Sequence, residues 1–188
     1  MFKSLALTSV FLGSMITSLY ASPYEIDING AHASINFEAS HLGFSVLTGR
    51  FDRFNGTFEY DSETPQSGHV SVEIDIGSVN SNHAERDNHL RGEGFFDVAN
   101  YPSANFVSTG VKMVDETHAI LSGNLTIRGI TKPVDLETSF IGEGDDPWGG
   151  YRAGFSAETT ILLGDFGMDG VIGNAPIRVI IHVEGIRQ

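Results

Sequence analysis

Hydrophobic and polar residues alternate along most of the chain after residue 23. In residues 69–76 (HVSVEIDI), valine and isoleucine occupy one face, and polar or acidic residues occupy the other. A period of two is typical of a half-buried β-strand. Segments rich in glycine, asparagine and aspartate separate these runs, as turns require. The other alternating segments are residues 24–28, 35–39, 106–111, 119–127, 134–141, 151–162 and 177–183.

One segment departs from this pattern. Between Ser78 and Pro102 the alternation lapses, and residues 82–91 (NHAERDNHLR) are almost entirely polar. This stretch is compatible with one or two helical turns, and it is followed by the pair Phe95-Phe96. Because the flanking segments are strands, we expect the insertion to lie over one end of the sheet.

The pattern predicts an all-β protein with a single domain. No fixed-length repeat, linker or low-complexity stretch divides residues 22–188. About eight antiparallel strands either stack as a sandwich or close into a barrel, and closure removes exposed sheet edges. A barrel of this size encloses either packed side chains or one small ligand.

The N-terminal residues have the features of a signal peptide. Lys3 gives a positive start, and no charged residue follows until Glu25. The apolar run is diluted by serine, threonine and glycine, and it ends in a plausible cleavage site after Ala21. We therefore expect residues 1–21 to be removed on export; an uncleaved anchor is the alternative.

Composition narrows the functional classes. The chain has 188 residues, with 11 basic and 24 acidic side chains and a formal charge of -13. Such acidity disfavours nucleic-acid binding, which depends on Lys and Arg contacts to phosphates. The absence of cysteine excludes disulfides, thiolate metal sites and thiol catalysis. An exported protein without disulfides is most simply a bacterial periplasmic one.

Phenylalanine is abundant and clustered. The chain has 13 Phe, and several of them fall between Phe37 and Phe58. Aromatic side chains fill ordinary cores well. They also line apolar cavities that hold chain-like ligands. Composition alone leaves both interpretations open.

The order of several motifs resembles that of the YceI-like family. The match begins near residue 24 and continues to the C-terminus, so it is more specific than any single motif. The segments that carry it are residues 31–37 (AHASINF), 41–46 (HLGFSV), 49–51 (GRF), 86–90 (RDNHL), 95–97 (FFD), 101–106 (YPSANF), 123–134 (GNLTIRGITKPV) and 165–167 (DFG).

This resemblance implies an exported, lipocalin-like antiparallel barrel of eight strands that binds a polyisoprenoid or another long amphiphile inside. No catalytic residue, metal or further cofactor is implied, and a homodimer is plausible. Strand alternation within such a barrel then selects the inward-facing ligand-binding candidates, to which His41 is added as a contact for a head group. They are Phe37, His41, Phe44, Val46, Phe51, Phe58, Val72, Ile74, Phe106, Leu125, Phe140 and Phe155.

Two positions depart from the family pattern. Ala33 stands where a serine often follows the first histidine, and Leu163 stands where an arginine commonly precedes the Asp-Phe-Gly motif. An arginine can bind phosphate or carboxylate through two hydrogen bonds, whereas leucine cannot. If that arginine contacts a head group in relatives, a neutral head such as a quinone or amide suits this chain better than a pyrophosphate.

Two alternatives to lipid binding are an enzyme that acts on the lipid and a metal- or protein-binding module. A secreted hydrolase or isomerase acting on the lipid could use His32, His41 and a nearby acid, but the sequence has no G-x-S-x-G motif. A metal- or protein-binding stress module could be centred on residues 82–97, which contain His83 and His89. Their spacing of six does not place them together on a helix, and no zinc motif accompanies them.

Overall fold

The computed structural model describes residues 21–170 and 172–188. All but the last residue of the expected signal peptide lies outside the described residues. Each alternating segment forms a strand of one antiparallel sheet, as the sequence predicts. The strands are β1 (Ser22–Ile26), β2 (Ser34–His41), β3 (Ser45–Phe51), β4 (Phe54–Tyr60), β5 (His69–Asp75), β6 (Val79–Asn80), β7 (Ser103–Met113), β8 (His118–Ile127), β9 (Ile130–Asp145), β10 (Tyr151–Leu162) and β11 (Pro176–Arg187).

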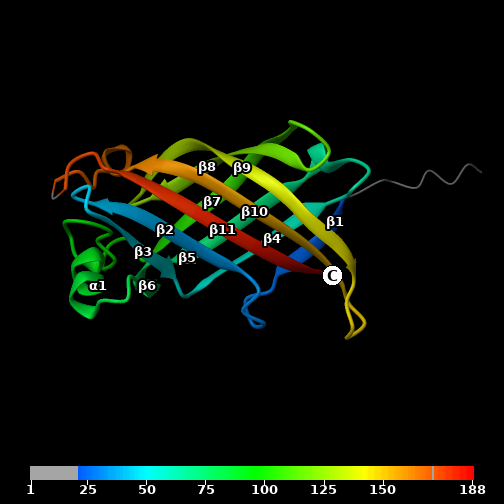
Figure 1. Ribbon diagram of the computed structural model, residues 1–188, viewed down its shortest axis with the longest axis horizontal. Helices are drawn as coiled ribbons and strands as arrows, with labels where there is room; N and C mark the ends of the chain where they lie inside the picture. The colour runs from blue at the N-terminus through cyan, green and yellow to red at the C-terminus, as the bar shows by residue number, and fades with distance from the viewer. Residues whose placement is uncertain (1–20, 171) are drawn as a thin grey trace, which may run out of the picture.

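The sheet closes into the predicted eight-stranded barrel. Hydrogen-bonded neighbours follow the order β1-β4-β5-β7-β8-β9-β10-β11, and β11 pairs again with β1. Figure 1 shows the strands crossing the molecule obliquely around a common interior. The joining pairs include Tyr24 opposite Arg187 and Ile26 opposite Gly185. Closure leaves no free edge within this ring of strands.

Three further strands extend the sheet beyond the ring. β2 pairs with the first half of β11, β3 pairs with β2, and the short β6 pairs with β3. A loop at residues 27–33 separates β1 from β2, and two residues separate β3 from β4. β2 and β3 therefore continue past the closed part of the barrel as a hairpin at one end (Figure 1).

The same end of the barrel is plugged by side chains. The buried cluster there comprises Ile76, Ala104, Ile127, Leu163, Phe166 and Met168. Part of it comes from the 3-10 turn η3 (Leu163–Phe166), which ends at Gly167 in the left-handed conformation, with φ of 68°. Two other short 3-10 turns are η1 (Pro65–Ser67) and η2 (Ile76–Ser78).

The polar insertion forms the predicted short helix, α1 (Ala84–Arg91). His83 is its N-cap: the Nδ1 atom accepts a hydrogen bond from the backbone N–H of Arg86 at 3.2 Å. Glu85 and Asp87 lie in the first turn, where the helix dipole favours acidic groups. α1 lies at the plugged end, as expected for this insertion (Figure 1).

None of the described helices is long and apolar enough to cross a bilayer.

Candidate functional site

The barrel encloses an apolar cavity of about 230 Å³. Its walls come from β1, β2, β4, β5 and all the strands from β7 to β11. The alternation in these strands explains this wall, because every second side chain points inward. Ser62, Pro65 and Thr117 lie at its rim, on the β4–β5 and β7–β8 connections. The cavity thus opens at the end opposite the side-chain plug.

A cluster of aromatic side chains lines the cavity near this opening. The ring of Tyr60 stacks on Phe140 with centroids 5.5 Å apart and meets Phe155 edge-on at 5.0 Å. Phe58 also contacts Phe155 edge-on at 5.5 Å, and its other side stacks on Tyr24 at 4.8 Å. Such geometries stabilise aromatic pairs beyond their burial. The group therefore forms a rigid apolar wall.

The ionisable groups that line the cavity lie close to its opening. They are Glu59, Tyr60, His69 and Glu116; among the described residues, no lysine or arginine lines it. Burial, helped by the negative charge of Glu143, raises the pKa of Tyr60 to about 12. A tyrosine phenol is neutral at physiological pH even at its ordinary pKa, and burial reinforces this, so the Tyr60 hydroxyl can donate a hydrogen bond.

The structure divides the sequence-predicted ligand-binding residues into two groups. Those that line the cavity are Phe58, Val72, Ile74, Phe106, Leu125, Phe140 and Phe155. Phe37, Phe51, His41, Phe44 and Val46 do not line it. The rings of Phe37 and Phe51 lie 5.8 Å apart, and Phe51 continues to Phe96 under the plug. His41, Phe44 and Val46 lie in the exposed β2–β3 hairpin. Their role in ligand binding stays a prediction.

Part of the cavity wall comes from residues outside the predicted set. Ile26, Ile35 and Phe54 line the cavity next to the β1–β2 and β3–β4 connections. The alternating residues Val179, Ile181 and Val183 of β11 also line it. The period-two pattern of residues 177–183 is a signal that could have identified the β11 residues, because alternate positions of a barrel strand share the inner face.

Leu163 lies away from the cavity. Its side chain is buried in the end plug beside Phe166 and Met168. Leu163 is therefore not placed to contact a ligand head group in the cavity, as the resemblance had suggested for this position. The charge of a suitable head group has to be inferred from the cavity opening instead.

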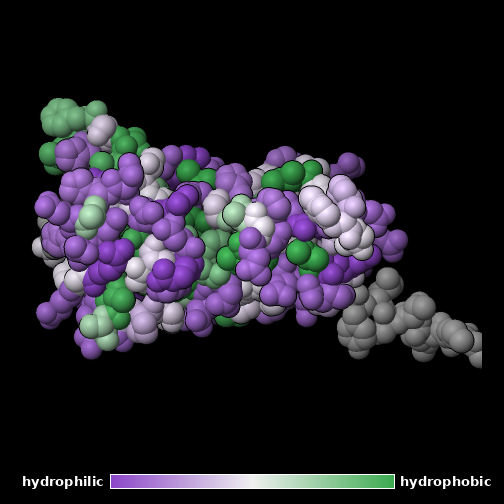
Figure 2. Space-filling model, turned by 90° about the horizontal axis from the view of Figure 1, so that it is seen from below, coloured by the Kyte–Doolittle hydropathy of each residue, from purple (hydrophilic) through white to green (hydrophobic). Residues whose placement is uncertain are grey.

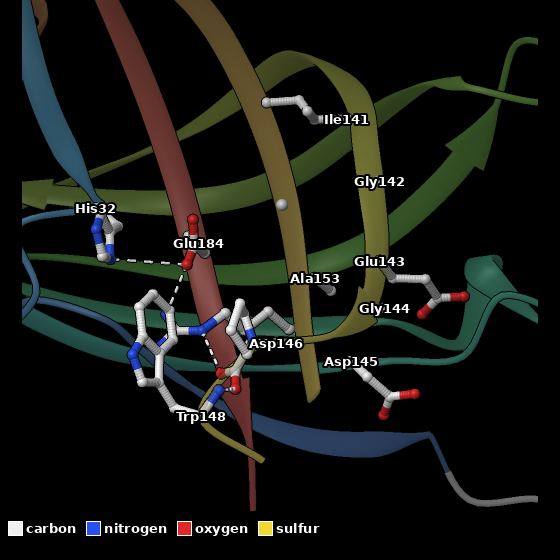
Figure 3. A pocket seen from close by; sticks show the side chains of 13 residues that line it. His32, Ile141, Gly142, Glu143, Gly144, Asp145, Asp146, Trp148, Ala153 and Glu184 are labelled. Atoms are coloured by element: carbon white, nitrogen blue, oxygen red, sulfur yellow. Dashed lines mark hydrogen bonds and ion pairs between the residues drawn. The ribbon is translucent and has the colours of Figure 1, made fainter. Parts of the chain in front are cut away.

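A second hollow, of about 490 Å³, lies on the outer wall of β9, β10 and β11 (Figure 3). Arg152 is its central charged group. The guanidinium donates to Asp27 Oδ2 at 2.7 Å, to Asp146 Oδ2 at 2.7 Å and to Glu184 Oε1 at 2.5 Å. The Trp148 ring lies 5.6 Å from the same guanidinium, and its position beside Asp146 and Glu184 is visible in Figure 3.

His32 belongs to this outer network. Its Nδ1 atom lies 2.9 Å from Asp27 Oδ2 and 3.7 Å from Glu184 Oε1. Among the described residues, these three are the one group with the spacing of metal ligands. The Arg152 guanidinium already binds both carboxylates, and its hydrogen bond is the main reason that the pKa of Asp27 falls to about 2. The arrangement therefore acts as an ionic junction that fastens the 27–33 loop to β10 and β11.

The histidines of the alternative functions do not come together. His32 lies just before β2, whereas His41 is its last residue. A strand of that length separates them by roughly 25–30 Å, so they cannot act on one bond. His83 caps α1, and His89 packs edge-on against Phe95 with centroids 5.2 Å apart. This geometry favours structural roles for both residues.

Comparisons with known proteins agree with the fold. The model of the YceI-like domain matches residues 24–184. A UPF0312 protein of Azotobacter vinelandii is 48% identical over 187 residues, covering 98% of this chain and 96% of the relative. Protein YceI of Salmonella arizonae is 49% identical, covering 91% and 90%.

Solved structures share the architecture. The YCEI protein of Campylobacter jejuni superimposes with a TM-score of 0.71 at 27% identity, covering 79% of this chain and 90% of that one. A polyisoprenoid binding domain of Saccharophagus degradans has a TM-score of 0.68 at 17% identity, covering 88% and 98%. BcnA of Burkholderia cenocepacia has a TM-score of 0.76 at 19% identity, covering 85% and 98%. By its matched domain and its relatives, the chain belongs to the YceI-like family.

Proposed function

We propose that this protein is a periplasmic carrier that holds a polyisoprenoid or another long-chain amphiphile in its barrel. The observation that carries the proposal is the apolar cavity, walled by alternate residues of nearly every strand and open at one end. Transferring apolar surface out of water contributes about 25 cal/mol per Å². A long hydrocarbon chain therefore gains more from this interior than a compact polar ligand does.

The opening of the cavity favours an uncharged head group. Glu59 and Glu116 line the rim, without a cationic side chain to offset them among the described residues that line the cavity. A carboxylate or pyrophosphate head would experience repulsion there. The neutral phenol of Tyr60 can donate a hydrogen bond to a carbonyl or hydroxyl oxygen. A quinone, amide or alcohol head fits this rim.

Export to the periplasm is part of the proposal. It is supported by the positive start, the uncharged run and the small residues before Ser22 in the sequence. The binding role requires no reaction, since burial of the chain accounts for affinity. The ionic junction around Arg152 supports this role by fastening the loop between β1 and β2 to the barrel wall.

The test compares two phenylalanine substitutions on β10, one inside the barrel and one outside. Ala157 lines the cavity, and Thr160 is exposed on β10. Ala157→Phe fills the interior, whereas Thr160→Phe adds the same group outside. Native mass spectrometry of protein purified from the periplasm without detergent, followed by solvent extraction, reports any bound lipid.

We expect a stoichiometric lipid on the unmodified protein and on Thr160→Phe, and loss of it from Ala157→Phe. Circular dichroism checks that both variants fold. A folded Ala157→Phe protein that retains the lipid would overturn the assignment of the cavity. An unmodified protein that is empty and takes up no added long-chain prenol or quinone would overturn the carrier function.

A further inference from the structure

The hollow on the outer wall of β9, β10 and β11 has a floor made largely of glycine. Gly142 of β9 pairs with Gly154 of β10. Two residues further along β9, Gly144 pairs with Arg152. A Cβ added at Gly142 or Gly144 would meet no heavy atom within 4 Å. Glycine weakens the interior of a strand, and it often marks a place where a ligand approaches the backbone closely.

Two large apolar side chains flank this floor. Trp148 is 77% exposed, and Ile141 is 67% exposed. Ile141 is the extra residue of a β-bulge, because the pairing of β9 with β10 passes from Gly142 directly to Phe140. Figure 3 shows Ile141 and Trp148 at opposite ends of the hollow. Large apolar side chains beside a hollow are typical of a binding site.

Most of the molecular surface has a different character. Figure 2 shows a largely hydrophilic face, on which apolar side chains gather on a projection at the plugged end and are scattered elsewhere. Single exposed apolar residues of that kind are ordinary for a folded protein. The outer hollow is distinct because its apolar side chains stand beside a concave floor that also carries charged groups.

The floor offers hydrogen-bonding atoms that the ionic junction leaves free. The Arg152 guanidinium uses Nε and Nη1 in the junction, and its Nη2 atom has no hydrogen-bond partner among the described residues. Within the same part of the chain, Glu184 Oε2 and His32 Nε2 also lack one. The floor therefore presents donors on Arg152, an acceptor on Glu184 and an imidazole nitrogen. Glu143 and Asp145 point away from these groups in Figure 3.

Charge and hydrogen-bonding capacity together favour an uncharged, hydroxyl-rich ligand. Three carboxylates, those of Asp27, Asp146 and Glu184, surround one guanidinium, so an anion would be repelled. A simple cation would meet the free N–H groups of Arg152 and could not accept hydrogen bonds from them. A hydroxyl group can accept from Arg152 and donate to Glu184. The exposed indole adds a flat apolar surface on which the C–H face of a sugar ring can stack.

We propose that the outer hollow binds a neutral pyranose ring that is one unit of an oligosaccharide. The ring stacks on Trp148, and its hydroxyl groups face Arg152 and Glu184 across the glycine floor. The volume of about 490 Å³ falls within the range of small-molecule sites, about 300–1,000 Å³. Because the hollow lies on the outer wall, the rest of the oligosaccharide can continue into solvent on either side of the bound ring.

The sugar site is separate from the lipid cavity. Among the described residues, none lines both the hollow and the cavity. Ala157→Phe, which fills the barrel, is therefore expected to leave sugar binding unchanged. Failure of the lipid carrier function and failure of the sugar site are consequently distinguishable.

The first test uses the fluorescence of Trp148. The chain has a single tryptophan, so the emission reports directly on the hollow. The mature protein is titrated separately with cellohexaose, maltohexaose and N-acetylchitohexaose, and the same titrations are followed by isothermal titration calorimetry. We expect at least one of these oligosaccharides to shift the emission and to give a matching calorimetric saturation curve.

Two substitutions test the geometry of the site. Trp148→Ala removes the stacking surface, and Gly142→Val places a side chain in the floor. Each is expected to weaken the binding measured by calorimetry about tenfold or more, as loss of a central contact does. Gly110→Val is the matched control, because a Cβ at Gly110 also meets no heavy atom within 4 Å and this residue lies on β7, outside the hollow. Circular dichroism checks that each variant folds.

Salt distinguishes a neutral ligand from a charged one. Binding of the oligosaccharide is expected to change less than about twofold between about 0.05 and 0.5 M NaCl, because screening acts on charges. Three results would overturn the proposal. One is that none of the three oligosaccharides binds the unmodified protein. Another is equal binding by Gly142→Val, Trp148→Ala and Gly110→Val. The third is a salt-sensitive shift of the emission by spermidine without any shift by the sugars, which would assign the hollow to an organic cation.

Discussion

Replacing Arg152 with leucine tests whether the outer ionic junction stabilises the fold by fastening the 27–33 loop, between β1 and β2, to β10 and β11. The Arg152 side chain is 19% exposed, and the Asp27 and Asp146 side chains are each 7% exposed. Removing the guanidinium leaves these carboxylates and Glu184 without their shared partner. Removing one partner of a buried ion pair costs about 3–5 kcal/mol when the remaining charge has no other partner. Asp27 and Asp146 keep hydrogen bonds from backbone N–H groups, so the lower end of that range applies. We therefore expect the free energy of unfolding to fall by about 3 kcal/mol or more.

Arg178 provides a matched control on the same sheet. It also bridges two carboxylates, at 3.0 Å from Glu38 and 2.5 Å from Glu158, but its side chain is 49% exposed. An exposed ion pair contributes at most about 1 kcal/mol. Arg178→Leu should consequently change the free energy of unfolding by less than about 1 kcal/mol.

The assays are urea-induced unfolding, which gives the free energy, and thermal unfolding, both followed by circular dichroism at neutral pH. For a domain of this size, a loss of about 3 kcal/mol lowers the melting temperature by roughly 10 °C. Equal effects of the two substitutions would refute the reasoning. If Arg152→Leu fails to fold, Asp27→Asn tests the same junction, because it removes one buried carboxylate and leaves the cation.

Three other predictions concern single residues, and a fourth concerns the N-terminus. Since the pKa of Asp27 is about 2 in the folded state and near 3.8 when unfolded, its contribution of about 2 kcal/mol is complete above pH 4. This contribution is lost as the pH falls from about 4 to 2, and unfolding curves of Asp27→Asn should lack that dependence. Ultraviolet titration should show one phenol, absent in Tyr60→Phe, that ionises only near pH 12. Gly123→Ala should destabilise the protein by about 1–3 kcal/mol in urea, because a Cβ there would overlap the Phe106 ring. N-terminal sequencing of the exported protein should begin at Ser22; a start at Met1 would contradict cleavage.

Alternation was sufficient to predict the strands, because it reports which face of a strand is buried; the closed barrel was implied by the resemblance to the YceI-like family. Residues 69–76 and 151–162 illustrate this, since their apolar positions such as Val72 and Phe155 line the cavity. The polar composition of residues 82–91 likewise predicted the short helix at one end. The strands and the helix depend on local pattern alone.

Alternation could not report position along the barrel axis. Phe37 and Phe58 share the same pattern, but β2 extends beyond the closed ring and β4 lies within it. Phe37 therefore packs over Gly49 at the plugged end, while Phe58 lines the cavity. The ionic junction was equally inaccessible, because Asp27 and Arg152 are far apart in the sequence and meet only after closure.

The two ends of the barrel differ, and this difference sets the direction in which a lipid would lie. The cavity opens beside the β4–β5 and β7–β8 connections, whereas the buried cluster that includes Phe166 and Met168 plugs the other end. A long-chain lipid entering from the open end would therefore place its hydrocarbon toward the plug. Its head group would then lie beside Glu59, Tyr60 and Glu116, which is why the rim, and not the plug, decides the chemistry of the head group in the proposed function.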